Sequence, residues 1–358
     1  MDILADIFST IISQFQKPTL AFLIGGMLIA AMGSKLEVPD PVYKFVVMLL
    51  LLKVGMSAGI SVREADLMSL AVPALFAALA GISIVLLGTQ TIARLRGVSH
   101  MDAMATAGLF GAVSASTLAA SMAVLDSEGI TYEGFIGALY PFMDIAALVT
   151  AIVLARMAKA RHAEAEMASG GAAVMGGTPE GGMGGAPKSG MSGAEVRDIF
   201  VDTFRSPAIS ALMLGLALGV FARPESVYAS FYEPLFRGLL SILMLVMGME
   251  AWSRLAEMRK VAGAYILYGL TAPIVHGMIG FGFGLVAHHI TGFSAGGVVL
   301  MATMAASSSD ISGPPTMRGA LPEANPSTYV GTSTGLGTPV AILSIPLFMA
   351  LADAMIGF

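Results

Sequence analysis

Residues 305–316 read AASSSDISGPPT, and a second polar stretch, GAVSAST, occupies residues 111–117. Each stretch interrupts a run of apolar residues that is otherwise typical of a buried helix. The Gly-Pro-Pro run at 313–315 cannot continue a helix, because proline lacks the backbone N–H and clashes with the preceding turn. A helix that breaks inside an apolar environment leaves free N–H groups at one end and free C=O groups at another. We therefore expect broken helices at both stretches.

The composition shows what surrounds these breaks. The chain has 358 residues, of which 56% are hydrophobic and 12% charged, and its mean hydropathy is +0.81. An average soluble domain has about 25% charged residues, so this chain is predicted to be a multi-pass membrane protein. The net charge of −5 argues against nucleic acid as a partner. The chain has no cysteine, which excludes disulfides and cysteine-bound metals.

The apolar runs predict an all-α membrane protein with ten transmembrane helices. A β-barrel is excluded, because its strands would alternate in hydropathy over about ten residues. The expected spans lie near residues 18–35, 41–60, 71–93, 102–124, 134–157, 206–222, 235–252, 261–288, 294–312 and 327–352.

Basic residues predict the orientation in the membrane. With ten spans, 14 of the 19 Lys and Arg residues fall on the face that holds the loop between the fifth and sixth spans. The positive-inside rule places this face in the cytoplasm and both termini outside. The loop itself, 159–204, is a Gly- and Met-rich linker between two units, 1–158 and 205–358. A phosphate-binding loop is not expected there, because Lys188 follows Pro187 instead of glycine.

The two units resemble each other weakly but in a constant order. Pro18 aligns with Pro207 and Gly55 with Gly248, and the motifs PDPVY at 39–43 and TYEG at 131–134 match PESVY at 224–228 and TYVG at 328–331. Five spans in each unit would place the two copies upside down relative to each other. Inverted repeats are typical of secondary transporters, whose binding site lies near the middle of the membrane. A duplicated channel is the alternative.

On this alignment Ser114 matches Ser307 and Ser116 matches Ser309, so the two breaks are related. Free N–H ends suit an anion, whereas C=O groups and hydroxyls suit a bare Na⁺. Asp310 is the strongest candidate for a functional residue, because placing a carboxylate at bilayer depth costs roughly 3 kcal/mol of insertion free energy. We interpret it as a cation ligand, the alternative being a solvated residue that caps a helix end. The serines at 114–117 are equally consistent with close helix packing.

Other ionisable residues are less specific. Asp144 is expected to be a buried carboxylate with its hydrogen bonds satisfied, and Glu250 to reach the cytoplasmic interface. Lys53 lies inside a span, where it snorkels or pairs with an acid. His276 is expected to be a packed, hydrogen-bonded residue.

An intramembrane enzyme is the competing class. The acids lie in FMD at Asp144 and SSD at Asp310, so neither the Tyr-Asp nor the Gly-x-Gly-Asp motif of intramembrane aspartyl proteases is present. Other hydrolase motifs are also missing from the sequence. A purely regulatory membrane protein would have no need of paired polar breaks. We therefore predict a transporter without catalytic residues or a cofactor.

At these motifs the chain resembles the SbtA-type sodium-dependent bicarbonate transporters. The resemblance covers nearly the whole chain apart from the linker. It rests on six uncommon strings: PTLAFLIGGMLIA (18–30), GLFGAVSAST (108–117), GALYPFMDIAALVTAIV (137–153), PLFRGLLSILMLVMGMEAWSR (234–254), APIVHG (272–277) and ASSSDISGPPTMR (306–318).

The resemblance implies Na⁺-coupled import of bicarbonate across a bacterial plasma membrane as a carbon-concentrating step. It implies a homotrimer whose protomers each have a gate part (spans 1, 2, 6 and 7) and a core part. A PII-like regulatory trimer would dock on the cytoplasmic face, although the linker differs from the charged linkers of the family. From the residues alone, a symporter for sulfate or a carboxylate stays open.

The family's substrate region falls on the two crossing segments, in agreement with the helix breaks. We expect bicarbonate to be bound by Gly111, Ala112, Val113, Ser114, Ala115, Ser307, Ser308 and Ser309. We expect Na⁺, the only metal ion involved, to be bound by Ser114, Ser116, Thr117, Ser309, Asp310 and Ser312.

Overall fold

The computed structural model describes residues 18–64, 67–170, 207–257, 263–310 and 313–358, together with Arg197, Val201 and Arg205. These residues form helices and connections and contain no strand, as the all-α prediction requires. Most of the expected linker and Ser312 lie outside the described residues.

The helices follow one another through the two predicted units. The first unit contains α2 (Pro18–Ala31), α3 (Asp40–Glu64), α4 (Leu67–Gln90), η1 (Ile92–Arg94), α5 (His100–Gly111), α6 (Ala115–Ser127), η2 (Gly134–Leu139) and α7 (Tyr140–Gly170). The second contains α9 (Pro207–Phe221), α10 (Glu225–Val227), η3 (Tyr228–Tyr232), α11 (Glu233–Glu257), α12 (Gly263–Thr291), α13 (Ala295–Ala306), α14 (Gly313–Ala320), α15 (Pro326–Val330), η5 (Gly331–Gly337), α16 (Thr338–Leu343) and α17 (Ile345–Met355).

Among the described residues, six helices are long and apolar enough to cross a membrane. They become seven if the bent pair that runs from Thr328 to Met355 counts as one span. Three shorter apolar helices, Ala21–Ala31, Ser210–Phe221 and Ala295–Ala306, occupy the places of predicted spans 1, 6 and 9. The chain is therefore a multi-pass helical protein, and the number ten stays a prediction.

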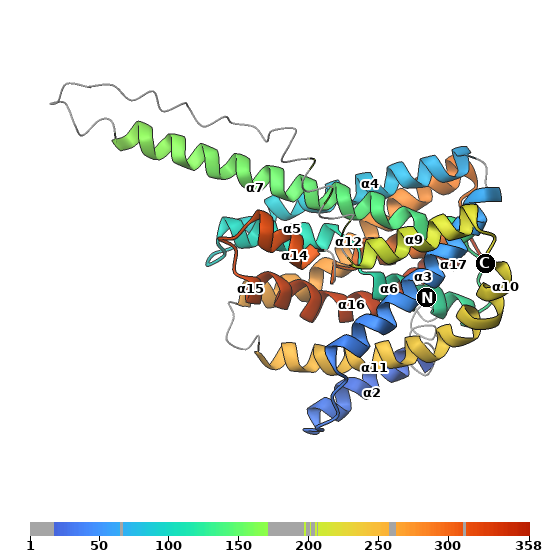
Figure 1. The fold of residues 1–358 in the computed structure, drawn as a ribbon. Coiled ribbons are helices and arrows are strands. Elements are labelled where there is room, and N and C mark those ends of the chain that lie inside the picture. Colours follow the sequence, from blue (N-terminus) through green and yellow to red (C-terminus); the bar gives the residue numbers. More distant parts are fainter. Residues whose placement is uncertain are drawn as a thin grey trace.

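Helix α7 is longer than the predicted fifth span. It continues to Gly170, whereas the span was expected to end near residue 157. The added sequence is rich in Ala and Glu, which have high helix propensity, so the helix continues after the apolar run ends. Figure 1 shows this part of α7 projecting beyond the other helices.

Four helices pair closely through glycines. Helix α2 packs against α11 and α3 against α9, and Figure 1 shows α2 and α11 together at the lower edge of the molecule. A Cβ placed on Gly26 would lie 3.1 Å from the Cα of Gly248, and one on Gly55 would lie 3.0 Å from the Cα of Gly215. Small residues allow this close approach. We call α2, α3, α9 and α11, which correspond to spans 1, 2, 6 and 7, the gate group.

Apart from α10 and η3, which lie with the gate group, the remaining helices form what we call the core group. Helices α4, α5 and α7 pack against one another, and α12 packs against α13 and α4. The two groups meet where α3 contacts η2 and α6, and where α11 contacts α6 and η5. The broken helices belong to the core group, so the gate group contacts the elements that carry the breaks.

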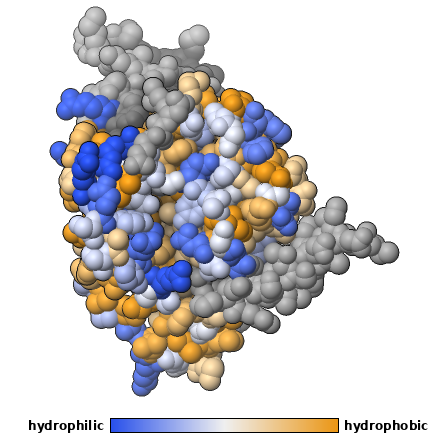
Figure 2. Space-filling model, turned by 90° about the vertical axis from the view of Figure 1, so that its right-hand side faces the viewer, coloured by the Kyte–Doolittle hydropathy of each residue, from blue (hydrophilic) through white to orange (hydrophobic). Residues whose placement is uncertain are grey.

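The exterior is apolar along many helices. Leu28, Leu75, Leu214, Leu267 and Ile290 are all more than half exposed. Figure 2 looks at the end of the bundle where α10 and the C-terminus lie, and shows hydrophilic side chains over much of this end and hydrophobic ones mostly toward its rim. Exposed apolar sides and a more polar end suit a helical protein embedded in lipid.

Candidate ion-binding site at the two broken helices

The first break lies between α5 and α6. Helix α5 ends at Gly111, and the N–H of Ala112 makes the last bond of that helix to the C=O of Gly108. Helix α6 starts after Ser114, whose Oγ accepts a hydrogen bond from the N–H of Thr117 at 3.1 Å. Serine is a preferred N-cap because its hydroxyl satisfies one free N–H of the first turn. The helix thus restarts after three intervening residues, 112–114.

The second break lies between α13 and α14. Helix α13 ends at Ala306, and the Oγ of Ser307 donates to the C=O of Met304 at 2.7 Å. Helix α14 begins at Gly313, whose N–H donates to the Oγ of Ser309 at 2.8 Å. The expected spans ended at 312 and resumed at 327, which left 313–326 as a connection. This was wrong for residues 313–320, which form a helix. The two prolines lie in the first turn of α14, where their missing N–H has no helical partner to lose.

The two breaks contact each other. The N–H of Ser114 donates to the Oγ of Ser307 at 2.9 Å, and the N–H of Ser309 donates to the C=O of Leu109 at 2.8 Å. The side chains of Ser114, Ser307 and Ser309 are fully buried. The structure therefore brings together the two segments that the sequence alignment relates, at one buried place.

Asp310 joins the second break to the first turn of α6. The Oγ of Ser114 donates to its Oδ2 at 3.1 Å, and the Oγ of Ser116 donates to the same oxygen. A carboxylate beside a helix N-terminus is further stabilised by the helix dipole. Asp310 thus lies inside the polar cluster and contacts the opposite broken helix, as its interpretation as a cation ligand requires. That ligand role stays a prediction.

Two buried residues hold the breaks in place. Asp144 of α7 accepts a hydrogen bond from the N–H of Val113 at 3.1 Å, and it is fully buried, which confirms its expected location. The hydroxyl of Thr338 bonds to that of Ser308 at 3.0 Å. Thr338 was missed from the sequence. The feature of the sequence that points to Thr338 is the polar run TSTGLGT at 332–338, within the last apolar span.

Thr117 presents a hydroxyl that has no partner within the described part of the chain. Its Oγ1 is completely buried and makes no hydrogen bond there. Buried hydroxyls nearly always have a partner, and exceptions often belong to functional sites. Because Thr117 follows Ser116 by one residue on α6, its hydroxyl is a reasonable ligand for an ion bound at the first turn.

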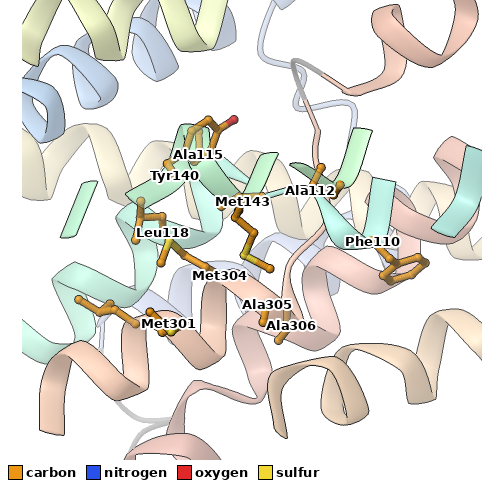
Figure 3. Close-up of a cluster of buried hydrophobic side chains, with 14 of the residues drawn as sticks. Phe110, Ala112, Ala115, Leu118, Tyr140, Met143, Met301, Met304, Ala305 and Ala306 are labelled. Carbon is orange, nitrogen blue, oxygen red and sulfur yellow. The ribbon is translucent and has the colours of Figure 1, made fainter. Parts of the chain in front are cut away.

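Apolar side chains surround the breaks. Figure 3 shows Met301, Met304 and Leu118 close together on one side of the crossing, and Phe110 on the other. These side chains are essentially inaccessible to solvent. Exclusion of water lowers the local dielectric, so the hydrogen bonds and dipoles at the breaks act more strongly on a bound ion.

A small cavity reaches Asp310 from the boundary between the two groups. Asp310 and Thr334 of the core group line one side, and Tyr43, Met247 and Glu250 of the gate group line the other. Its volume of about 20 Å³ is enough for one water-sized particle. The polar cluster is therefore adjacent to the place where the gate and core groups meet.

Comparison with known proteins identifies the family. A family model for the Na⁺-dependent bicarbonate transporter superfamily matches residues 18–353. The chain belongs to this superfamily. No curated protein matches the chain. Membership confirms the resemblance found in the sequence and the prediction that the chain is a membrane transporter and not an enzyme.

Sodium-dependent bicarbonate transport makes bicarbonate and Na⁺ the substrates of this superfamily member. No cofactor is expected in such a transporter, and Na⁺ fits as the coupling ion. Within the described residues, no group of three or more His, Asp and Glu side chains is placed to hold a metal. The ligands available at the breaks are instead hydroxyls, backbone groups and one carboxylate, which are ligands that Na⁺ accepts in transporters.

The structure brings most of the predicted site residues together. The segments Gly111–Thr117 and Ser307–Asp310 cross at the breaks and are linked by the hydrogen bonds described above. Ser312 lies outside the described residues. Which of these residues contacts each ion stays a prediction.

Proposed function

We propose that the chain is a Na⁺-coupled symporter that imports bicarbonate and binds both ions where the two broken helices cross. One observation carries this proposal. Ser114 of the first break contacts both Ser307 and Asp310 of the second, through its N–H and its Oγ respectively. A ligand that binds either break therefore acts directly on the other.

Bicarbonate suits the backbone and hydroxyl groups of the breaks. The N–H groups of Ala115 and Ser116, in the first turn of α6, have no acceptor within their own helix. In the proposal these two N–H groups and the hydroxyls of Ser114, Ser307, Ser308 and Ser309, turned from their present acceptors, donate to a small planar anion. Gly111, Ala112 and Val113 line the site, and the N–H groups of Ala112 and Val113 stay bonded to Gly108 and Asp144. A helix N-terminus favours negative charge, so the anion needs no arginine.

Sodium suits the oxygen atoms that lie around Asp310. The hydroxyls of Ser114 and Ser116 already converge on its carboxylate, and the Thr117 hydroxyl is available on the same helix turn. In the proposal these atoms, Ser309 and Ser312 surround the cation. Opposite charges enter a low-dielectric site at lower cost together than apart, which makes binding of the two ions cooperative.

The inward Na⁺ gradient then drives uptake of the ion pair. The membrane potential adds about 2.3 kcal/mol per 100 mV for each net charge that crosses, that is, for each Na⁺ carried beyond one per bicarbonate. Coupling requires that Na⁺ and bicarbonate raise each other's affinity by the same factor. In the proposal the core group moves against the gate group and carries the ion pair between the two faces by alternating access.

The glycine contacts support an inverted repeat, which this mechanism uses. The predicted alignment pairs Gly26 with Gly215 and Gly55 with Gly248. Replacing each glycine by its aligned partner turns the contact between Gly26 and Gly248 into the contact between Gly215 and Gly55. A Cβ on Gly26 would lie 3.1 Å from the Cα of Gly248, and one on Gly215 would lie 3.0 Å from the Cα of Gly55. Two copies related by a pseudo-two-fold axis would produce this equivalence.

The starts of the broken helices point to the same relationship. Helices α5 and α13 each have 12 residues. Ser99 caps α5 by accepting from the N–H of Asp102, and Ser294 caps α13 by accepting from the N–H of Gly297. These matching lengths and caps support the ten-span arrangement and the two units 1–158 and 205–358.

The proposal extends to assembly and location through the family resemblance. It includes a homotrimer in a bacterial plasma membrane, with both termini outside and the 159–204 linker in the cytoplasm. It also includes a role in carbon concentration and a PII-like trimer as a partner on the cytoplasmic face.

Uptake of radiolabelled bicarbonate by cells that express the chain tests the proposal. We expect uptake that requires Na⁺ and is not reduced by excess sulfate. Uptake that is equal in Na⁺ and K⁺ would contradict symport. Competition by sulfate or by a small carboxylate would instead assign the chain a different anion.

A further inference from the structure

Lys53 is a buried cation that the mechanism above does not use. It lies near the middle of α3 and is only 6% exposed. Its Nζ lies 4.3 Å from the ring centroid of Phe236 and 5.6 Å from that of Tyr228. Within the described part of the chain it makes no hydrogen bond and no ion pair. Arg63, at the end of the same helix, does have a counter-charge, because it pairs with Glu225.

Packing alone does not account for a lysine at this position. A buried charge is costly unless it is paired, and an apolar side chain of similar volume usually stabilises such a place better. The two aromatic rings offset part of the cost by cation–π attraction. They supply no negative charge, so within the described residues the ammonium has no counter-ion. A buried positive charge without an acid partner in this part of the chain can be paired by an anion from outside the chain.

The surroundings of Lys53 place it close to the boundary between the gate and core groups. The helices that hold it, α3 and α11, both contact α6. Helix α6 begins at Ala115, is capped by Ser114 and carries Ser116 in its first turn. The next residue on α3, Val54, packs against Gly137 of η2 in the core group. A shift of the core group along the gate group would therefore change the environment of Lys53.

We propose that Lys53 is a transient binding point for the transported anion on the gate group. The ammonium attracts a small monoanion as the gate and core groups separate, and returns to the rings of Phe236 and Tyr228 once the anion has moved on. This inference rests on the proposed function. It adds a gate residue that sets the rate and affinity of anion capture and makes no contact with Na⁺.

Two substitutions separate charge from packing. Lys53→Met keeps most of the length of the side chain without its charge, and Lys53→Arg keeps the charge. We expect Lys53→Met to raise the bicarbonate concentration needed for half-maximal uptake roughly tenfold or more, with the Na⁺ requirement at saturating bicarbonate unchanged. Lys53→Arg should retain most of the wild-type affinity. Lys35→Met, which removes an exposed lysine between α2 and α3, is the control and should behave as wild type.

The absence of cysteine from the chain allows a charge-rescue experiment. Lys53→Cys is treated during turnover with methanethiosulfonates that attach an aminoethyl, a methyl or a sulfonatoethyl group, and labelling is followed by mass spectrometry. We expect only the positive aminoethyl group to restore uptake, and bicarbonate to slow the labelling. Lys35→Cys should be labelled without any effect on uptake.

Several outcomes would overturn this inference. They are wild-type bicarbonate affinity in Lys53→Met, equal rescue by the neutral and positive groups, or a thiol that never reacts during turnover. A loss of thermal stability with unchanged bicarbonate affinity would make Lys53 a packing residue. If the wild-type chain shows no Na⁺-dependent bicarbonate uptake, the proposed function itself fails, which is a separate result from failure of the Lys53 variants.

Discussion

Ser114 combines three contacts in one residue. Its Oγ caps α6 through the N–H of Thr117 and donates to Asp310, while its N–H donates to Ser307. An N-cap serine contributes about 1 kcal/mol to helix stability whether or not it binds a ligand. Its contribution to capping therefore has to be separated from its contribution to substrate binding.

Ser99 provides that separation. It caps α5 with the same geometry, accepting from the N–H of Asp102 at 3.1 Å, and lies at the opposite end of that helix from the break. We expect both Ser114→Ala and Ser99→Ala to lower the melting temperature, Ser114→Ala by more because it also loses the bond to Asp310. Only Ser114→Ala should weaken bicarbonate binding, measured by calorimetry on purified protein in Na⁺. Equal bicarbonate affinities in the two variants would make Ser114 a capping and packing residue.

Asp310 accepts hydrogen bonds from two hydroxyls of the first break, those of Ser114 and Ser116. Replacement by asparagine keeps its size but removes the negative charge that a cation would need. We expect Asp310→Asn to raise the Na⁺ concentration required for half-maximal uptake about tenfold or more, since interactions with a charged group are worth about 1.5–3 kcal/mol. Asp353→Asn, at an exposed position on α17, is the control. Unchanged Na⁺ dependence in Asp310→Asn would remove this residue from the cation site.

At the scale of elements, the apolar runs predicted where helices lie but not how they end. The breaks at 112–114 and 307–310 were predictable, because serines and a Gly-Pro-Pro run interrupt apolar sequence at aligned positions. The restart of a helix at Gly313 was not predictable. Prolines break the interior of a helix, but they also fit into the first turn of a new one. The continuation of α7 to Gly170 was missed because the expected span ended with its apolar residues.

Long-range partners were the least predictable part of the site. Nothing in the sequence near Ser308 or Val113 indicates that they bond to Thr338 and Asp144. These contacts join helices that are distant in the chain and depend on how the helices pack. The proximity of Asp310 to Ser114 was predictable only through the repeat, which suggested that the two breaks form one site.

Close helix pairing makes a prediction at the element scale. A Cβ on Gly26 would overlap the backbone C=O of Leu245 on α11, whereas one on the neighbouring Gly25 meets nothing within 4 Å. We expect Gly26→Ala to destabilise the protein by roughly 1–3 kcal/mol, as overpacking does. Gly25→Ala should leave the thermal unfolding midpoint of the detergent-solubilised protein unchanged. Equal midpoints for the two variants would contradict the α2–α11 packing.

For the whole molecule, the arrangement separates a paired gate group from a core group that carries both breaks. Helix α3 belongs to the first and η2 to the second, and the two pack directly against each other. The small cavity at Asp310 lies along the same boundary. Transport by alternating access therefore requires relative movement of these two surfaces.

A cross-link across this boundary tests the movement. A Cβ on Gly137 of η2 would lie 3.6 Å from the Cβ of Ala58 on α3, within the range for a disulfide. In the cysteine-free chain we expect the double variant Ala58→Cys/Gly137→Cys to lose uptake on oxidation and regain it on reduction. A Cβ on Gly137 would also lie 2.6 Å from the Cγ1 of Val54, so the single variants control for packing: each should transport before oxidation and be insensitive to the oxidant. Full uptake by the oxidised, cross-linked protein would mean that transport does not need α3 and η2 to separate.

The central claim is that Na⁺ and bicarbonate bind together at the crossing of the two broken helices. Calorimetric titration of bicarbonate into the purified wild-type protein, in Na⁺ and in K⁺ at equal ionic strength, tests it most directly. We expect tight binding only in Na⁺, with bicarbonate raising the Na⁺ affinity by the same factor in the reciprocal titration. Bicarbonate affinity that is the same in Na⁺ and K⁺ would contradict it.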